Sequence, residues 1–156
     1  MVGSHIGELL LINLSTITAA AQTVINGAAI SGLTVERGER INFDPGRCPW
    51  CGIYPDALTT SPFSMSGQNW KGTGSIQIVL QTASFVDDGQ EASDALETLA
   101  AGVESALVAN PTLGVQGVRI VGFNRDYRYI VFDDDGNGTI FMPQVIIRPQ
   151  LEIRSQ

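Results

Sequence analysis

The spacing of hydrophobic residues predicts two helices. Between Ile6 and Ile30 the sequence is rich in Leu, Ile and Ala, lacks proline and places apolar residues at helical spacing. We expect a helix there, with a break near residues 13–16 where Ser15 would cap a second segment. The second helix has the more regular pattern: Asp88 is suited to its N-cap, and Pro111 ends it because the residue before a proline disfavours helix.

Alternating and β-branched segments predict the strands. A short strand is expected within residues 33–41, and longer ones at 75–86, at 115–132 with a bend or bulge at Gly122, and at 139–154. Prolines cannot donate to a ladder, so Pro143 and Pro149 predict that the last strand lies at an edge of the sheet or is bulged.

The segment 42–74 is rich in proline and glycine, and we expect one long loop there. The order helix, strand, loop, strand, helix, hairpin predicts an α+β fold, with a mostly antiparallel sheet and two helices packed on one face. At 156 residues the prior is a single domain covering 1–156, of which residues 1–5 are expected to be disordered.

The chain is acidic. With 16 acidic and 9 basic residues the net charge is −7, which argues against a protein that wraps nucleic acid. No run of apolar residues is long enough to span a membrane.

Two charged clusters follow from this pattern. The second helix carries an acidic face (Asp94, Glu97, Glu104), which is either a solvated face or a surface for a basic neighbour or for a channel that must not hold DNA. The strand after it carries a basic cluster (Arg119, Arg125, Arg128), which is either the polar side of a sheet or a patch that meets the acidic helix of a neighbouring subunit.

Three motifs suggest chemistry. Cys48-Pro-Trp-Cys51 has the spacing of a redox dithiol or of half a zinc site, but no helix start follows it and His5 is the one histidine. The run 133–138 matches the start of a calcium loop, although Gln144 stands where a bidentate Glu is required, and it equally fits a hairpin turn. The glycine-rich run 67–74 is expected to be a mobile loop rather than a phosphate cradle. No catalytic set, metal site or cofactor site is expected.

One stretch resembles a known family. The residues around the first cysteine are Glu39-Arg40-Ile41-Asn42, Asp44-Pro45 and Arg47-Cys48-Pro49-Trp50, and they resemble the loop of bacteriophage tail terminator, or tail completion, proteins. The strand 76–82 and the helix that ends in Asn110-Pro-Thr-Leu-Gly114 extend the resemblance over most of the chain. Cys51 departs from it, since that position is usually aliphatic in the family, and so does the acidic turn.

The resemblance implies a structural virion protein without enzymatic activity. Such subunits form a ring, commonly a hexamer, that caps the head-proximal end of the tail tube, ends its polymerisation and provides the surface for head joining. The implied partners are further copies of the chain, the tube protein and a head completion or connector protein, with DNA passing through unbound and no membrane contact. The implied location is the virion tail, after assembly in the host cytoplasm. The loop from Arg40 to Trp50 would serve as anchor and assembly site. Two alternatives stay open: another head–tail connector, neck or tube-like subunit, and a thiol oxidoreductase that uses Cys48 and Cys51.

Overall fold

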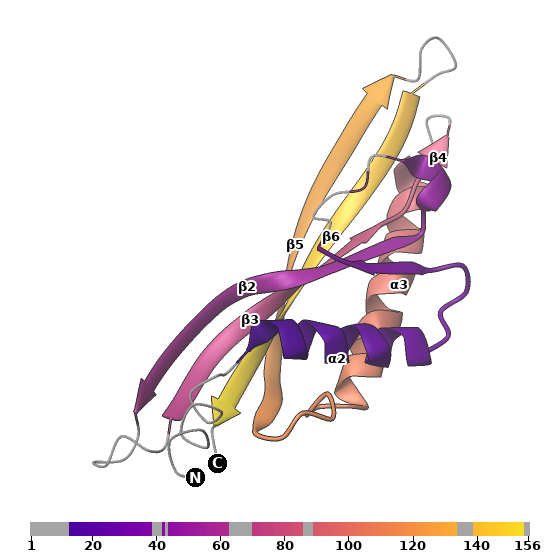
Figure 1. Ribbon diagram of the computed structural model, residues 1–156. Coiled ribbons are helices and arrows are strands. Elements are labelled where there is room, and N and C mark those ends of the chain that lie inside the picture. The colour runs from indigo at the N-terminus through magenta and orange to yellow at the C-terminus, as the bar shows by residue number, and fades with distance from the viewer. Residues whose placement is uncertain are drawn as a thin grey trace.

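A single mixed sheet with two helices on one face forms the fold. The computed structural model describes residues 13–38, 42, 44–62, 70–85, 89–133 and 139–154. Within these ranges the helices are α2 (Leu14–Gly27) and α3 (Gly89–Val108), with a short 3-10 helix at Pro45–Arg47. The strands are β1 (Thr34–Arg37), β2 (Trp50–Pro62), β3 (Trp70–Gln81), β4 (Ser84–Phe85), β5 (Val118–Asp133) and β6 (Thr139–Arg154). Figure 1 shows α2 lying across the strands while α3 runs along β6. The predicted α+β class is therefore confirmed.

The strand order places β6 inside the sheet. β1 pairs with β2, β2 with β3, and β3 with β6, while β4 continues the β3 side and β5 pairs with the other side of β6. Among the described strands, only the β1–β2 pairing is parallel. The prediction that residues 139–154 form an edge strand is wrong, because β6 has strands on both sides. The predicted irregularity at Gly122 is confirmed as a register shift in β5 between Ile120 and Gly122.

The prolines of β6 lie where the ladder to β3 and β4 is interrupted. The pairing of β6 with β3 pauses between Ser75↔Gln150 and Ile78↔Ile147, which is where Pro149 falls. Pro143 falls between the last β3 pair, Gln81↔Gln144, and the first β4 pair. There its carbonyl accepts a hydrogen bond of 3.4 Å from the Thr82 N–H. A central strand can hold both prolines because their missing N–H groups face these gaps.

The predicted long loop 42–74 is wrong over most of its length. β2 and β3 occupy Trp50–Pro62 and Trp70–Gln81 and pair antiparallel from Trp50↔Gln81 to Pro62↔Trp70. A register shift between Pro55 and Ala57 absorbs the first internal proline of β2. The expected mobile loop 67–74 is likewise strand from Trp70 onward, and residues 67–69 lie outside the described residues.

The helix boundaries differ from expectation only at their ends. α2 begins at Leu14 with Asn13 rather than Ser15 as its N-cap: the Asn13 side chain accepts a hydrogen bond of 2.8 Å from the Ser15 N–H. α3 ends at Val108, before Asn110-Pro111, as predicted. The expected N-cap Asp88 and residues 1–12 lie outside the described residues. None of the helices among the described residues combines the length and apolarity that crossing a bilayer demands.

The main core lies between the helices and one face of the sheet. The α2 residues in this core are at i, i+4 and i+8 (Ile17, Ala21, Ile25), and those of α3 form a similar stripe (Leu96, Leu99, Ala100, Val103, Leu107). They pack on alternate residues of β2, β3 and β6, which face the helices (Cys51, Ile53, Ile76, Ile78, Leu80, Val145, Ile147, Leu151, Ile153). We call this side of the sheet the helix face and the opposite side the open face.

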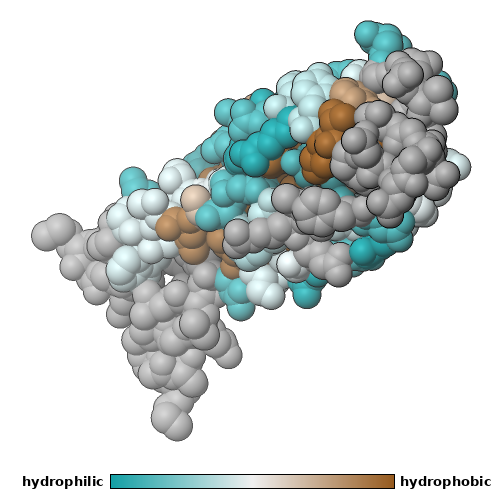
Figure 2. Space-filling model, turned by 90° about the horizontal axis from the view of Figure 1, so that it is seen from above, coloured by the Kyte–Doolittle hydropathy of each residue, from teal (hydrophilic) through white to brown (hydrophobic). Residues whose placement is uncertain are grey.

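The open face and the surface are largely polar. In the view from above, hydrophobic atoms form small patches that are separated by polar ones (Figure 2). The open face does hold one small apolar cluster, in which Trp50, Val79 and Ile146 are buried and Cys48 and Tyr54 are partly buried.

Candidate functional site

The turn that carries the family-like residues is fixed to the sheet at its base. Asn42 is 2% exposed, and its backbone N–H donates to Gln81 Oε1 at 3.0 Å, while its carbonyl accepts from Gln81 Nε2 at 3.1 Å. Gln81 is itself fully buried at the end of β3. These two hydrogen bonds satisfy four polar groups, which would cost free energy if they were buried without partners. The base of the turn is therefore held in one position relative to β3.

Side-chain hydrogen bonds also shape the turn itself. The Asn42 side chain accepts from the Asp44 N–H at 2.9 Å and donates to the Asp44 carbonyl at 2.8 Å. Asp44 in turn caps the 3-10 helix by accepting from the Gly46 N–H at 2.9 Å. Such Asx turns replace backbone pairing where the chain reverses. Asp44 and Gly46 are exposed, so a fixed base supports an accessible tip.

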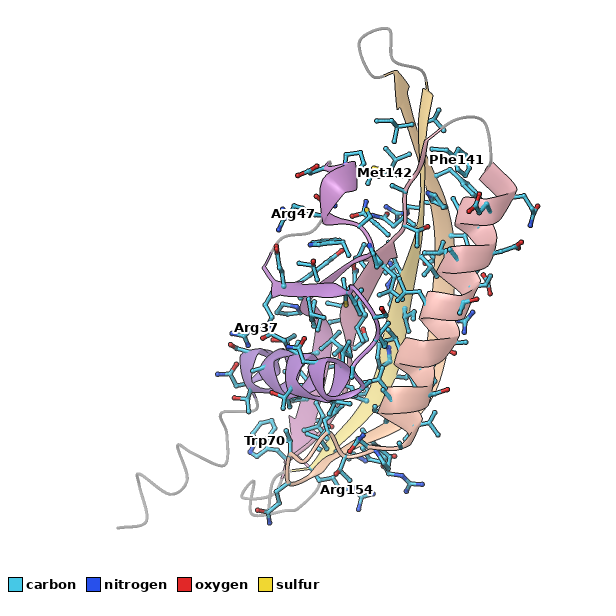
Figure 3. All side chains as sticks on the ribbon, turned by 90° about the vertical axis from the view of Figure 1, so that its right-hand side faces the viewer. Arg37, Arg47, Trp70, Phe141, Met142 and Arg154 are labelled. Atoms are coloured by element: carbon cyan, nitrogen blue, oxygen red, sulfur yellow. The ribbon has the colours of Figure 1, made fainter. Side chains whose placement is uncertain are left out.

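Arg47 ties the turn to β1. Its guanidinium forms an ion pair with Glu36, and the Thr34 N–H donates to the Pro49 carbonyl at 3.0 Å. The Cys48–Pro49 peptide bond is cis. In the side view, Arg47 projects from the turn far from Arg154, which lies at the opposite end of the sheet (Figure 3).

Trp50 anchors the turn on the open face. It is fully buried against Val79 and Ile146, with Cys48 and Tyr54 beside it. Its indole Nε1 has no hydrogen-bond partner among the described residues. Trp50 therefore stabilises the turn by burying apolar surface, and a tryptophan side chain buries a large area.

The structure describes seven of the eight residues that are predicted to form the anchor and assembly site. Asn42 and Trp50 hold the base of the turn, and the residues between them form it (Asp44, Pro45, Arg47, Cys48, Pro49). Arg40, the remaining predicted residue, lies outside the described residues. Beside the turn, a hollow of about 460 Å³ opens towards α3, lined among others by Pro45, Cys48, Pro49 and Leu99.

The two cysteines do not form a site together. Trp50 and Cys51 are consecutive in β2, so their side chains point to opposite faces of the sheet. Cys51 lies in the helix-face core, whereas Cys48 contacts the Trp50 cluster on the open face. Both cysteines are free thiols.

The environment of each thiol keeps it protonated. Burial raises the pKa of Cys48 from its ordinary 9.0 to about 11, partly offset by the hydrogen bond from Asn42 and reinforced by the charge of Asp44. Burial alone raises the pKa of Cys51 to about 12. A redox dithiol needs the opposite shift. No cluster of metal-ligating side chains occurs in the described ranges, and His5 lies outside them.

The predicted acidic surface is partly neutralised by the chain's own arginine. Arg125 of β5 holds Glu104 through two hydrogen bonds, Nε to Oε1 at 2.7 Å and one terminal nitrogen to Oε2 at 2.6 Å. Its other terminal nitrogen lies 3.2 Å from Glu97 Oε2. The bonds to Glu104 and Tyr127 raise the pKa of Arg125 above its ordinary value. Asp94 is exposed and accepts a hydrogen bond from Gln90.

The predicted basic patch is wrong as a single cluster. Arg125 is on the helix face beside α3, as its bonds to Glu104 show. Arg119 lies on the open face, where it lines a hollow with Glu152 and Arg154. Arg128 shares its face with Asp126, which pairs with Arg148 there. Strand alternation puts Arg125 on the face opposite Arg128, and Arg119 lies nine residues from Arg128 along the open face. The partner of the acidic helix is in the same subunit.

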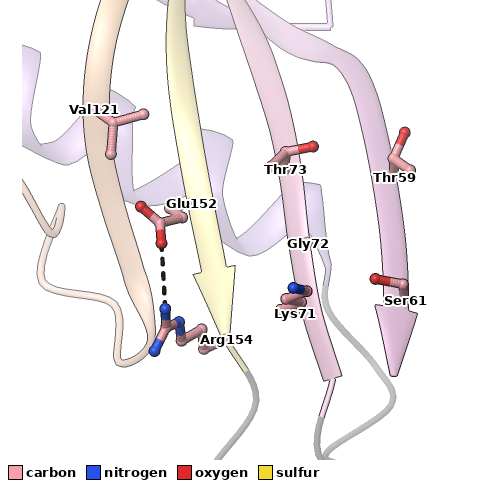
Figure 4. Close-up of a pocket in the computed structure, with 8 residues that line it drawn as sticks. All are labelled: Thr59, Ser61, Lys71, Gly72, Thr73, Val121, Glu152 and Arg154. Carbon is pink, nitrogen blue, oxygen red and sulfur yellow. Dashed lines mark ion pairs between the residues drawn. The ribbon is translucent and has the colours of Figure 1, made fainter. Parts of the chain in front are cut away.

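The open face instead gathers most of the positive charge. Five of the nine basic residues lie on it (Lys71, Arg119, Arg128, Arg148, Arg154). At one end, four neighbouring strands line a hollow of about 390 Å³ with Thr59, Ser61, Lys71, Thr73, Val121, Glu152 and Arg154 (Figure 4). Glu152 and Arg154 form an ion pair at 3.5 Å within it. The net charge of −7 is thus unevenly distributed.

Sequence reasoning missed Gln81 and Glu36 as parts of the site. Gln81 falls on the polar side of an alternating strand, and nothing in its sequence neighbourhood indicates a partner 39 residues earlier. The tip of the acidic turn, residues 134–138, lies outside the described residues. The hairpin that it closes is confirmed by the pair Asp133↔Thr139.

Comparison with known proteins adds a weak structural likeness. No protein-family model matches the chain, and no curated protein matches it. Among solved structures, it is similar to a chain of a structure described as "Virion of native gene transfer agent (GTA) particle". The TM-score is 0.42 at 15% identity, covering 94% of this chain and 91% of that one. At that score the likeness assigns no function.

Proposed function

We propose that this chain is a structural virion protein, a tail terminator subunit. In this role it forms a ring on the head-proximal end of a phage tail tube, stops tube growth and presents a surface for joining the head. Its partners are other copies of itself, the tube protein and a head completion or connector protein. DNA passes through the ring without specific binding, and the chain performs no catalysis.

The observation that carries the proposal is the turn from Asn42 to Trp50. Its residues give the chain its most specific resemblance to tail terminators, and hydrogen bonds and burial hold its base on the sheet. Asn42 and Trp50 are buried, while Asp44 and Gly46 are exposed. A fixed base below an accessible tip is what a docking element needs, because little conformational entropy is lost on binding.

The geometry speaks against the thiol oxidoreductase alternative. Cys51 lies in the helix-face core whereas Cys48, in the turn, packs against the Trp50 cluster, and burial raises the pKa of both thiols. The connector alternative shares the ring geometry, so the test must also identify the tail end that the chain binds.

The test is tube growth with the chain present. The tube protein of the same particle is polymerised with a small molar fraction of this chain, and tube lengths and ends are measured by negative-stain electron microscopy. We expect shorter tubes that carry, at the head-proximal end, a cap of about six copies. Unchanged tube lengths with bare ends would refute the proposal, and caps at the other end would favour a different connector.

A matched pair of variants tests the role of the turn. Arg47→Ala removes the link between the turn and Glu36, and Arg154→Ala removes an equally charged side chain at the far end of the sheet. The Arg47–Glu36 pair is half-buried and the Glu152–Arg154 pair is exposed, so thermal melts verify that both variants remain folded. We expect Arg47→Ala to lose capping and Arg154→Ala to keep it.

A further inference from the structure

β5 leaves one long edge of the sheet without a strand partner among the described residues. It runs for 16 residues and pairs only with β6. The opposite edge is blunted: β1 covers the start of β2, and the rest of β2 contains Pro55, a register shift and Pro62. Natural sheets use prolines and bulges in this way to prevent edge pairing. Beyond Gly122, β5 has no such device.

The backbone groups of β5 that point outwards can be identified. The Arg154 N–H donates to the Gly117 carbonyl and the Thr82 N–H to the Pro143 carbonyl, so even residues of β6 face β5 and odd ones face β3. The register then turns Asp126 and Arg128 towards β6. The N–H and C=O groups of the odd residues 123–131 point away from the sheet.

Among the described residues, only the part of this edge before the bulge at Gly122 is covered. The Ile120 N–H donates to the Pro111 carbonyl at 2.7 Å and the Val118 N–H to the Val115 carbonyl at 3.2 Å. The turn after α3 therefore shields β5 as far as the bulge. From Phe123 to Val131, no outward backbone group has a backbone partner among the described residues.

Exposed hydrophobic side chains concentrate on the same strand. Five large hydrophobic residues are exposed in the described ranges, and four of them are in β5 (Val121, Tyr127, Tyr129, Val131), at 46–59% exposure. Residues 127, 129 and 131 alternate along the strand and thus share the helix face with Arg125. Unpaired backbone and exposed apolar side chains together mark an interaction surface.

We propose that the β5 edges of two copies pair antiparallel about a two-fold axis at Tyr127, which joins two sheets into one. With Tyr127 opposite its own copy, Arg128 of each chain lies opposite Asp126 of the other on the open face. On the helix face, Val131 lies opposite Phe123 and Tyr129 opposite Arg125. Apolar, cation–aromatic and opposite-charge cross-strand pairs each stabilise a sheet, and Tyr127 is one of the residues whose amide points outward.

Neighbouring positions of the axis are less favourable. An axis at Arg125 or Arg128 sets two arginines opposite each other, and one at Asp126 sets two aspartates opposite each other. Like charges directly opposite destabilise a strand pair. An axis at Tyr129 places Arg128 opposite Ile130 and loses both charge pairs. The register at Tyr127 is the one in which charge and hydrophobicity complement each other.

This contact is independent of the proposed tail function. It is two-fold, whereas a ring is built from head-to-tail contacts. It is also tested on the free protein, without tube protein, so that either proposal can fail while the other stands.

The first test is the mass of the free protein by light scattering after size exclusion, over a range of concentrations. We expect the mass to rise towards twice the 16.7 kDa of one chain. Tyr127→Lys places two lysines against each other at the axis and should abolish the rise. Val121→Lys adds the same charge at a similarly exposed position of β5 outside the paired segment and should retain it. Circular dichroism verifies that both variants are folded.

The second test fixes the register with single cysteines under mild oxidation. Tyr127→Cys brings two thiols together at the axis, within the span of a disulfide. In the same register, Val131→Cys separates the two new thiols by eight residues, about 27 Å. We expect covalent dimers from Tyr127→Cys, few from Tyr129→Cys and none from Val131→Cys or the unmodified chain. A chain that stays monomeric at all concentrations, or crosslinks that favour position 129 or 131, would overturn the proposal.

Discussion

Gln81 holds the backbone of Asn42 through two hydrogen bonds across 39 residues of sequence. This relationship places the family-like turn on the end of β3. Both residues are buried, so the amide of Gln81 replaces the water that the Asn42 backbone would otherwise bind. The turn therefore depends on a residue of the central sheet that the turn sequence does not contain.

We expect Gln81→Ala to lower the free energy of unfolding by about 2–3 kcal/mol, because two hydrogen bonds are lost and the Asn42 groups stay buried without partners. Urea denaturation measures the change. Gln77→Ala serves as control, since it removes the same side chain from the same face of β3, where its bond to Asp56 is exposed. If both variants lose equal stability, the Asn42 contact is not the reason.

Trp50→Ala should cost about 3–5 kcal/mol, because it empties the centre of the apolar cluster on the open face. Trp50→Phe should cost much less, since the indole nitrogen has no described hydrogen bond to lose. Thermal unfolding followed by circular dichroism gives both values. A Phe variant as unstable as the Ala variant would mean that the indole makes a polar contact in solution.

The thiols should be unreactive near neutral pH. Because burial raises the pKa of Cys48 to about 11 and that of Cys51 to about 12, both stay protonated at pH 7–8 in the folded state. Each pKa lies above its unfolded value near 9, so the thiols contribute stability that is fully present below pH 9 and is lost as the pH rises through 11 and 12.

The rate of labelling by a thiol reagent, measured from pH 7 to pH 10, tests this expectation. Labelling in the native state should be far slower than in urea, and Cys51→Ser should leave the reactivity of Cys48 unchanged. Rapid labelling of one cysteine at pH 7, or reduction of insulin disulfides by the protein, would restore the redox alternative.

Glu104→Gln should destabilise the protein by about 1 kcal/mol, whereas Glu97→Gln should have almost no effect. Arg125 binds Glu104 with two hydrogen bonds between side chains that are 25% and 21% exposed, but Glu97 is 52% exposed and makes one longer contact. Urea denaturation at low and high salt checks both, and the loss should shrink in high salt. Equal effects of the two variants would contradict the unequal pairing.

Gly117→Ala should be strongly destabilising, by more than about 1 kcal/mol. Gly117 has a φ of +81°, and a Cβ there would lie 2.1 Å from the Arg154 carbonyl oxygen. Gly114→Ala is the matched control: its φ is +71° but its Cβ would meet no atom within 4 Å, so it carries only the left-handed backbone cost. Thermal melts of both variants separate the steric clash from that cost, and equal losses would argue against the clash.

Much of the fold follows from local pattern. The 3.6-residue stripe of α3 and the alternation of β6 predict their elements to within a few residues, because each packs one continuous face on the core. The local pattern does not predict β2. Its register shift at Pro55–Ala57 moves the buried positions to the other parity, so no single alternation runs through it, and its prolines resemble those of a loop.

Pairing across the sheet is the part that the sequence does not reveal. Arg125 reaches Glu104 from 21 residues away, and Glu36 meets Arg47 only because β1 and β2 lie parallel. The grouping of Arg119, Arg125 and Arg128 is wrong because Arg125 and Arg128 alternate to opposite faces, and the bulge at Gly122 turns Arg119 to the face of Arg128.

Pro143 and Pro149 also disfavour other alignments of β6 with its neighbours. Both are odd-numbered and turn towards the interrupted β3 and β4 ladder. A slip of β6 by one residue would turn them towards β5, whose pairing is continuous from Gly122 to Asp133, and two hydrogen bonds would be lost. The same slip would expose the apolar face of β6. A misaligned hairpin would therefore lose both hydrogen bonds and apolar burial, so the prolines favour the native alignment.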